Sequence, residues 1–154
     1  MSKKGFTLIE LLIVISIIGL LASIVLVGFG SFRARGRDAR RIADLRETQN
    51  ALELFYTKNN AYPGSLDWAT LISDLTGAGI GVNAIPNDPL NSPTNPIVYL
   101  YSPSTDFQNY AIGAVLEDPN HPVLQTDVDS PLNFTDVNGI DCGDLTAPVY
   151  CVAF

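Results

Sequence analysis

The sequence predicts an α+β protein in which one long N-terminal helix packs on a small antiparallel sheet. Three features predict this fold class. Residues 6–32 form an almost unbroken apolar run. Residues 33 to about 58 keep apolar side chains at helical spacing between charged ones. Residues 59–154 are rich in Pro, Asn, Asp and Gly, with short apolar runs between turn signals. We call residues 6–58 the stem and residues 59–154 the head.

The first half of the stem is long enough to cross a membrane. Glu10 is the only ionisable side chain from Phe6 to Phe32. A helix of these 27 residues rises about 40 Å, which exceeds the roughly 30 Å hydrocarbon core of a bilayer. We therefore expect a membrane-spanning half at about 6–32, preceded by a short polar leader at 1–5.

The second half of the stem is amphipathic, so we expect its apolar face to cover a sheet. A helix stop follows at Lys58-Asn59-Asn60, where a cationic last turn and Asn precede Tyr62-Pro63-Gly64. The apolar residues of this half are Ile42, Leu45, Leu52, Phe55 and Tyr56.

The head is predicted to hold one short helix and three strands. Ser65 or Asp67 is a candidate cap for a helix that carries Trp68, Leu71, Ile72 and Leu75. Hairpins between the strands would produce a small antiparallel sheet. The expected strands are residues 97–101, 110–116 and 149–154.

Charge is divided unequally along the chain. Residues 1–58 hold all nine basic residues and five acidic ones, a net +4, whereas residues 59–154 hold the other 11 acids and no Lys or Arg. An acidic head argues against nucleic acid as a partner, because phosphate backbones need basic side chains. It suits metal ions or the basic stems of sister copies. His121 is the only histidine, and we expect no enzyme activity.

The first ten residues resemble a known processing site. Lys3-Lys4-Gly5-Phe6-Thr7-Leu8-Ile9-Glu10, followed by the apolar run, resembles the start of type IV pilins and of type II secretion pseudopilins. In that family a membrane-embedded aspartyl peptidase cuts after the glycine, and the new N-terminus is methylated. Weaker resemblance continues at Ala51-Leu52-Glu53, Tyr62-Pro63, Asn87-Asp88-Pro89-Leu90 and Tyr99-Leu100-Tyr101.

The resemblance implies a role for each residue of this motif. Cleavage would fall between Gly5 and Phe6, and Phe6 would be N-methylated. Glu10, with its neighbour Thr7, would act in assembly by meeting the N-terminal amine of the next subunit. A lone carboxylate or a lone ammonium is costly in an apolar environment, and a pair costs much less. This explains why an apolar helix would keep a charge at Glu10.

The resemblance also implies partners and a location. The expected partners are further copies and other pilins in a polymer, a prepilin peptidase and methyltransferase, an assembly platform with its ATPase, and membrane lipids. Unassembled subunits would span the inner or cytoplasmic membrane once, with the head outside. Assembled subunits would lie in an extracellular or periplasmic filament.

Three other readings stay open. The chain could be a major-type pseudopilin of a type II secretion system, or an uncleaved membrane-anchored protein with a metal-binding head. An ordinary secretory signal is less favoured, because its apolar core is about 7–15 residues long. The positive-inside rule opposes an outside head, since five arginines follow the apolar run between Arg33 and Arg41. The acidic head and its cysteines favour the outside.

Two features of the C-terminal region point to an exported head. Pilins often carry a C-terminal disulfide loop, and Cys142 and Cys151 are expected to form one, with two buried thiols as the alternative. A cluster of aspartates is a weak calcium candidate, because calcium prefers several carboxylate oxygens in a flexible loop. We expect no other cofactor. The candidate ligands are Asp127, Asp129, Asp136, Asp141 and Asp144.

Overall fold

The structure is a computed structural model, and it describes the backbone and side chains of part of the sequence. The described residues are 5–93, 97, 99–128, 142 and 148–154, and for residues 24–29 it describes the backbone alone.

The chain forms two compact units, Met1–Arg35 and Gly36–Phe154. Helix α1, Leu8–Asn59, contributes residues to both. The later part of this helix supplies side chains to the core of the second unit. Among the described residues, no helix combines the length and the apolarity that a membrane span requires.

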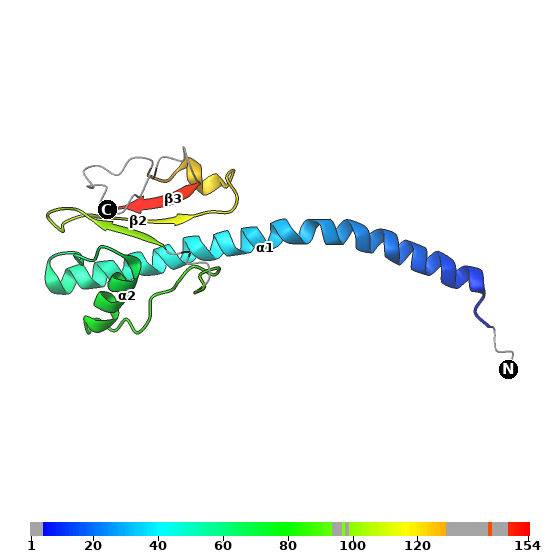
Figure 1. Cartoon of the computed structure of the whole chain (residues 1–154), viewed down its shortest axis with the longest axis horizontal. Helices are drawn as coiled ribbons and strands as arrows, with labels where there is room; N and C mark the ends of the chain where they lie inside the picture. The colour runs from blue at the N-terminus through cyan, green and yellow to red at the C-terminus, as the bar shows by residue number, and fades with distance from the viewer. Residues whose placement is uncertain (1–4, 94–96, 98, 129–141, 143–147) are drawn as a thin grey trace. The chain divides into compact units, whose positions relative to one another are not determined.

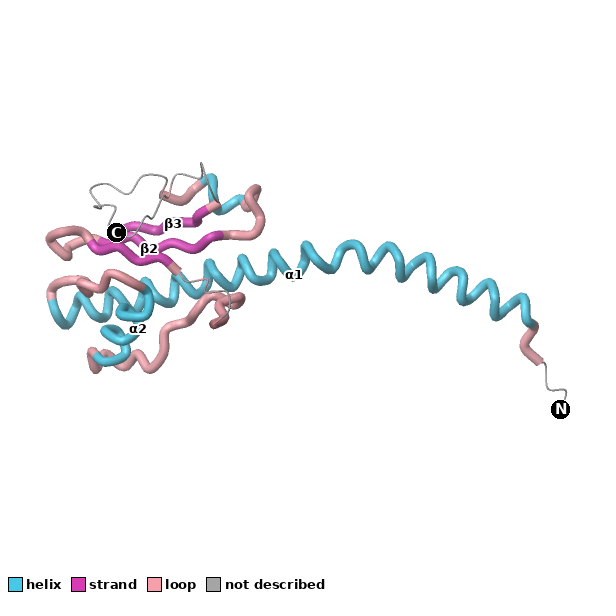
Figure 2. Tube along the Cα trace, viewed as in Figure 1, coloured by secondary structure: helices cyan, strands magenta, loops and turns pink. Residues whose placement is uncertain are grey.

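The second unit contains a three-stranded antiparallel sheet in the order β1-β2-β3 (Figures 1 and 2). The register pairs Leu100 with Gly113 and Gly113 with Cys151. The predicted α+β class, with helix α1 packed on this sheet, is therefore confirmed. The elements after α1 are α2 (Trp68–Gly77), β1 (Leu100–Pro103), β2 (Tyr110–Val115), the 3-10 helix η1 (Pro122–Gln125) and β3 (Val149–Ala153).

Strand β1 begins three residues later than the sequence predicts. The expected strand was 97–101, and the observed one is Leu100–Pro103. The register accounts for the C-terminal end of β1, because Pro103 lies opposite Tyr110, the first residue of β2.

The helix ends are set by local hydrogen bonds. Helix α1 ends one residue beyond the expected position, and Asn60 adopts a left-handed φ of 55° while its N–H donates to the Tyr56 carbonyl at 2.7 Å. Asp67 caps α2 by accepting from the Thr70 N–H at 2.8 Å. Ser65, the other candidate cap, instead donates to Asp74 Oδ2 at 2.6 Å.

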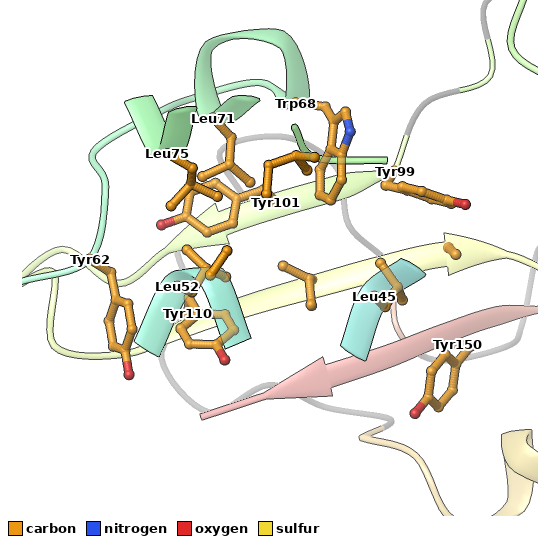
Figure 3. Close-up of a cluster of buried hydrophobic side chains, with 14 of the residues drawn as sticks. Leu45, Leu52, Tyr62, Trp68, Leu71, Leu75, Tyr99, Tyr101, Tyr110 and Tyr150 are labelled. Atoms are coloured by element: carbon orange, nitrogen blue, oxygen red, sulfur yellow. The ribbon is translucent and has the colours of Figure 1, made fainter. Parts of the chain in front are cut away.

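The core of the head lies between the sheet and the two helices (Figure 3). Leu45 and Leu52 of α1 are fully buried in it. Trp68 of α2 packs edge-on against Tyr99, with ring centroids 5.1 Å apart, and its indole N–H donates to the Pro86 carbonyl at 3.2 Å. Truncating a buried leucine to alanine costs about 2–5 kcal/mol, so Leu52 contributes substantially to the stability of the packing between α1 and the head.

The opposite face of the sheet carries a second apolar cluster. Cys142, Val149 and Cys151 are buried there, with Leu100 packed against them. A Cβ at Gly113 would lie 3.2 Å from Cys151 Sγ and 3.3 Å from Val149 Cγ1. The absence of a side chain at Gly113 therefore leaves room for the cystine on this face.

Candidate functional site

The apolar part of α1 leaves its side chains uncovered within the single chain. Thirteen large apolar residues from Phe6 to Leu21 and at Phe32 are each 44–85% exposed. Isolated soluble proteins rarely expose so large a contiguous apolar surface. Apolar patches of this size mark sites of contact with lipid or with other protein.

Thr7 and Glu10 form a capping box at the start of α1. The helix begins at Leu8, so Thr7 is its N-cap and Glu10 its third residue. The Thr7 N–H donates to Glu10 Oε2 at 2.8 Å, and the Thr7 hydroxyl donates to the same oxygen at 2.6 Å. In return the Glu10 N–H donates to Thr7 Oγ1 at 3.3 Å. The carboxylate is thus held at the helix terminus through Oε2.

The predicted cleavage site precedes this box. Gly5 and Phe6 lie before the first turn of α1, and Phe6 is 77% exposed. A Cβ at Gly5 would meet no atom within 4 Å. The fold therefore places no steric demand for glycine at this position. Residues 1–4, with the basic part of the motif, lie outside the described residues.

A buried arginine joins α1 to two loops of the head. Arg41 donates through Nε to Asp88 Oδ2 at 2.6 Å and through Nη2 to Asp88 Oδ1 at 3.2 Å. Its Nη1 donates to Asp38 Oδ1 at 2.7 Å and to Glu117 Oε1 at 2.8 Å. The Arg41 side chain is only 2% exposed. Burial opposes the charged form, but the bonds to the three carboxylates outweigh it and raise the pKa of Arg41.

Asp38 and Arg37 extend this cluster. The Asp38 carboxylate accepts from the backbone N–H groups of Glu117 and Asp118, each at 3.0 Å. Arg37 makes two bonds to Glu117, Nε to Oε1 at 2.7 Å and Nη2 to Oε2 at 2.5 Å. The two bonds from Arg37 and the one from Arg41 lower the pKa of Glu117 to about 2. We call Arg37, Asp38, Arg41, Asp88 and Glu117 the arginine cluster.

A tyrosine makes a further polar contact one turn along the helix. The Tyr99 hydroxyl donates to Asp44 Oδ2 at 2.7 Å, and Arg40 Nε lies 3.7 Å from the same oxygen. Burial of the ring and the bond to Asp44 raise the pKa of Tyr99. Three of the five arginines between Arg33 and Arg41 therefore lie within 4 Å of carboxylates of the second unit, namely Arg37, Arg40 and Arg41.

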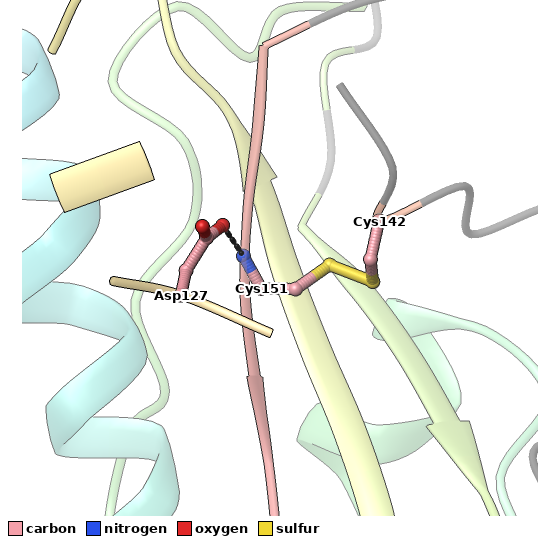
Figure 4. The surroundings of a disulfide bond; sticks show 3 residues. All are labelled: Asp127, Cys142 and Cys151. Carbon is pink, nitrogen blue, oxygen red and sulfur yellow. Dashed lines mark hydrogen bonds between the residues drawn. A yellow bond between two sulfur atoms is a disulfide. The ribbon is translucent and has the colours of Figure 1, made fainter. Parts of the chain in front are cut away.

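The predicted disulfide is present, and an aspartate lies beside it (Figure 4). Cys142 and Cys151 are joined, with Cα atoms 5.8 Å apart. Asp127 Oδ2 accepts from the Cys151 N–H at 3.1 Å, so this carboxylate has a structural role at the edge of β3. Among the described residues no group of acids, cysteines or histidines forms a metal site. Four of the calcium candidates lie outside the described residues, namely Asp129, Asp136, Asp141 and Asp144.

Comparisons with known proteins agree with the N-terminal motif. Residues 1–26 match the prokaryotic N-terminal methylation motif. The type II secretion system core protein G of Aeromonas hydrophila is 30% identical over 102 residues, which cover 59% of this chain and 70% of that protein. The chain belongs to the type IV pilin and type II secretion pseudopilin family. The predicted family is thus confirmed.

Other members of the pilin and pseudopilin family match over a shorter stretch. The major component of the type IV wide pilus of Thermus thermophilus is 41% identical over 72 residues, covering 47% of this chain and 53% of that protein. The core protein G of Escherichia coli is 34% identical over 61 residues, covering 40% of this chain and 42% of that protein. These matches span about half of the relatives or less. No solved structure matches the chain.

Sequence reasoning missed two features of this family member. The capping box was readable as Thr-x-x-Glu before an apolar run, a recognised helix-start signature. The arginine cluster had weaker signals. Asp38 and Arg41 are three residues apart on one helix, a spacing that allows a salt bridge. Nothing local to Asp88 or Glu117 indicates that the chain brings them to Arg41.

Proposed function

We propose that this protein is a structural subunit of a type IV pilus-like filament and has no catalytic site of its own. The observation that carries the proposal is the exposed apolar surface from Phe6 to Leu21 and at Phe32, which begins with a processing motif. A subunit that is first held in a membrane and then packed against sister stems covers this surface in both states.

Processing after Gly5 and methylation of Phe6 form part of the proposal. Gly5 and Phe6 precede the helix, where a peptidase can bind extended backbone. The fold makes no demand for glycine at position 5, so a requirement for it would come from the enzyme that reads the site. The partners proposed here are a prepilin peptidase and methyltransferase, an assembly platform with its ATPase, and membrane lipids.

The capping box supports a role for Glu10 in assembly. Thr7 binds Oε2 of the carboxylate, which leaves Oε1 for the N-terminal ammonium of a neighbouring Phe6. N-methylation keeps the positive charge of that amine, so the pair survives the modification. In an apolar filament core, the pairing of two otherwise costly charges sets the position of each subunit against the next.

The arginine cluster bears on orientation. The positive-inside rule counts basic residues that flank a membrane segment. Arg37 and Arg41 are paired with carboxylates of the folded head. Their positive charges are therefore neutralised on whichever side of the membrane the head folds. This pairing and the cystine support a head outside the cytoplasmic membrane, where disulfides persist.

The first test is the intact mass and the N-terminal sequence of the protein purified from its own membranes. We expect a chain that begins at Phe6 and is heavier by one methyl group. A chain that begins at Met1 or Ser2 would contradict the proposal and favour the uncleaved anchor.

A pair of variants then tests assembly. Glu10→Leu should be processed and retained in membranes but should fail to enter filaments. Glu47→Gln is the control, because it removes an exposed carboxylate elsewhere on α1 and should assemble normally. If Glu10→Leu assembled as well as Glu47→Gln, the proposed role of Glu10 would be wrong.

A secretion pseudopilin is the second candidate, since a type II secretion core protein G is matched over 70% of its own length. Deletion of the gene separates the two: loss of secreted enzymes indicates a pseudopilin, and loss of surface pili indicates a pilin.

A calcium site near Asp127 also stays a prediction, which calorimetric titration of the purified protein with calcium would check.

A further inference from the structure

The charges of the second unit are matched incompletely within one copy. Arg37 and Arg41 bind carboxylates, Arg40 lies near Asp44, and the Lys58 ammonium donates to the Ala78 carbonyl at 2.5 Å. Arg46 is exposed on α1, and in the described part of the chain its side chain has no hydrogen bond or ion pair. Arg46 is thus a cation without a partner among the described residues of its own subunit.

Exposed carboxylates gather at one end of the head. Asp67, Asp74 and Asp106 are exposed, and within the part of the chain that the structure describes they accept hydrogen bonds from neutral groups only. The segment from Tyr62 to Asp67 links them. The Tyr62 N–H donates to the Phe107 carbonyl at 2.8 Å in the Asp106 turn, and Ser65 donates to Asp74. We call Asp67, Asp74 and Asp106 the acidic end.

Apolar side chains accompany the charges on both surfaces. At the acidic end, Leu66 is 58% exposed and Phe107 is 41% exposed. On α1, Leu54 is 50% exposed and lies eight residues after Arg46, on the same face of the helix. The acidic end and the row Arg46, Asn50 and Leu54 therefore match in both charge and apolar character.

We propose that the acidic end of one subunit docks on the Arg46–Leu54 row of a second copy of this chain. The inference rests on the proposed filament function and adds a contact between heads to the contacts between stems. The head has no Lys or Arg after Lys58, so heads brought together by the stems repel one another unless a stem cation lies between them. Arg46 supplies that cation.

The contact also fixes a geometric relation. The acidic end lies close to the C-terminal end of α1, and Arg46–Leu54 is centred about nine residues earlier. At 1.5 Å per residue, the two copies are offset along the helix by on the order of 10–20 Å.

The test uses the full chain in its own cells and measures the ratio of sheared filament protein to unassembled subunit in the membrane. Arg46→Gln changes the net charge by one unit. Asn120→Asp makes the same change at an exposed turn and serves as the control. We expect Arg46→Gln to lower the ratio up to about fivefold, the size typical of an exposed ion pair, and Asn120→Asp to leave it unchanged. High salt should remove the difference.

A charge swap identifies the partner. Arg46→Glu and Asp74→Lys should each lower the ratio, and the chain that carries both should recover it. The inference would be overturned if Arg46→Glu gave the same ratio as Asn120→Asp. It would also be overturned if the chain with both changes gave a ratio no higher than that of the single variant that assembles less well. If the double variant did not recover the ratio and Arg46→Glu was also less retained in membranes, lipid rather than a second copy would be the partner of Arg46. Absence of filaments from the unchanged protein would overturn the proposed function, and this inference with it.

Discussion

Replacing Arg41 with methionine should destabilise the head strongly. Methionine fills a similar volume but leaves Asp38 and Asp88 without their cation, and these side chains are 0% and 1% exposed. Removing one partner of a buried ion pair costs about 3–5 kcal/mol, because the remaining charge stays desolvated. For a unit of this size, 1 kcal/mol corresponds to roughly 4 °C, so we expect Tm to fall by about 12–20 °C.

The melt should be followed by near-ultraviolet circular dichroism of the full chain in detergent micelles. Trp68 and the buried tyrosines report packing in the head, whereas far-ultraviolet signal is dominated by α1. Arg37→Gln is the comparison. Its pair with Glu117 is 30% and 28% exposed, and such a pair contributes about 1 kcal/mol or less.

A further substitution sharpens this experiment. Asp88→Asn in the Arg41→Met background removes one of the uncompensated charges, so it should recover part of the lost stability. The reasoning would be refuted if Arg41→Met melted within a few degrees of the unchanged protein, or no lower than Arg37→Gln.

Three further predictions concern single features of the head. Glu117 has its pKa lowered from 4.5 to about 2, so its contribution is complete above pH 4.5 and is lost as pH falls toward 2. Acid titration of stability should show a loss of about 1 kcal/mol in that window, because solvent screens the partly exposed Glu117 pair, and Glu117→Gln should flatten it. Replacing Cys142 and Cys151 by serine should lower the unfolding free energy by about 2.7 kcal/mol, the loop-closure value for ten residues, measured by urea unfolding. Asp67→Ala should cost about 1 kcal/mol in the same assay, because Thr70 loses its capping bond.

Local rules were sufficient for most elements of the fold. Helical spacing of Leu45 and Leu52 predicted which face of α1 the head covers, and both residues are fully buried. Lys58-Asn59-Asn60 predicted the end of α1 to within one residue. Strand β1 was misplaced because its bounds depend on pairing with β2, which no property of residues 97–101 reveals.

The sequence by itself determined the family, the apolar surface at 6–32 and the division into a basic stem and an acidic head, since composition and contiguous motifs are local properties. Tertiary structure alone decided which charges neutralise one another. Asp88 and Glu117 lie 47 and 76 residues after Arg41 in the chain, yet both contact its guanidinium. Contacts of such separation depend on how the loops return across the sheet, so Arg41 became an internal ion-pair centre while Arg46, one and a half turns later, stayed exposed.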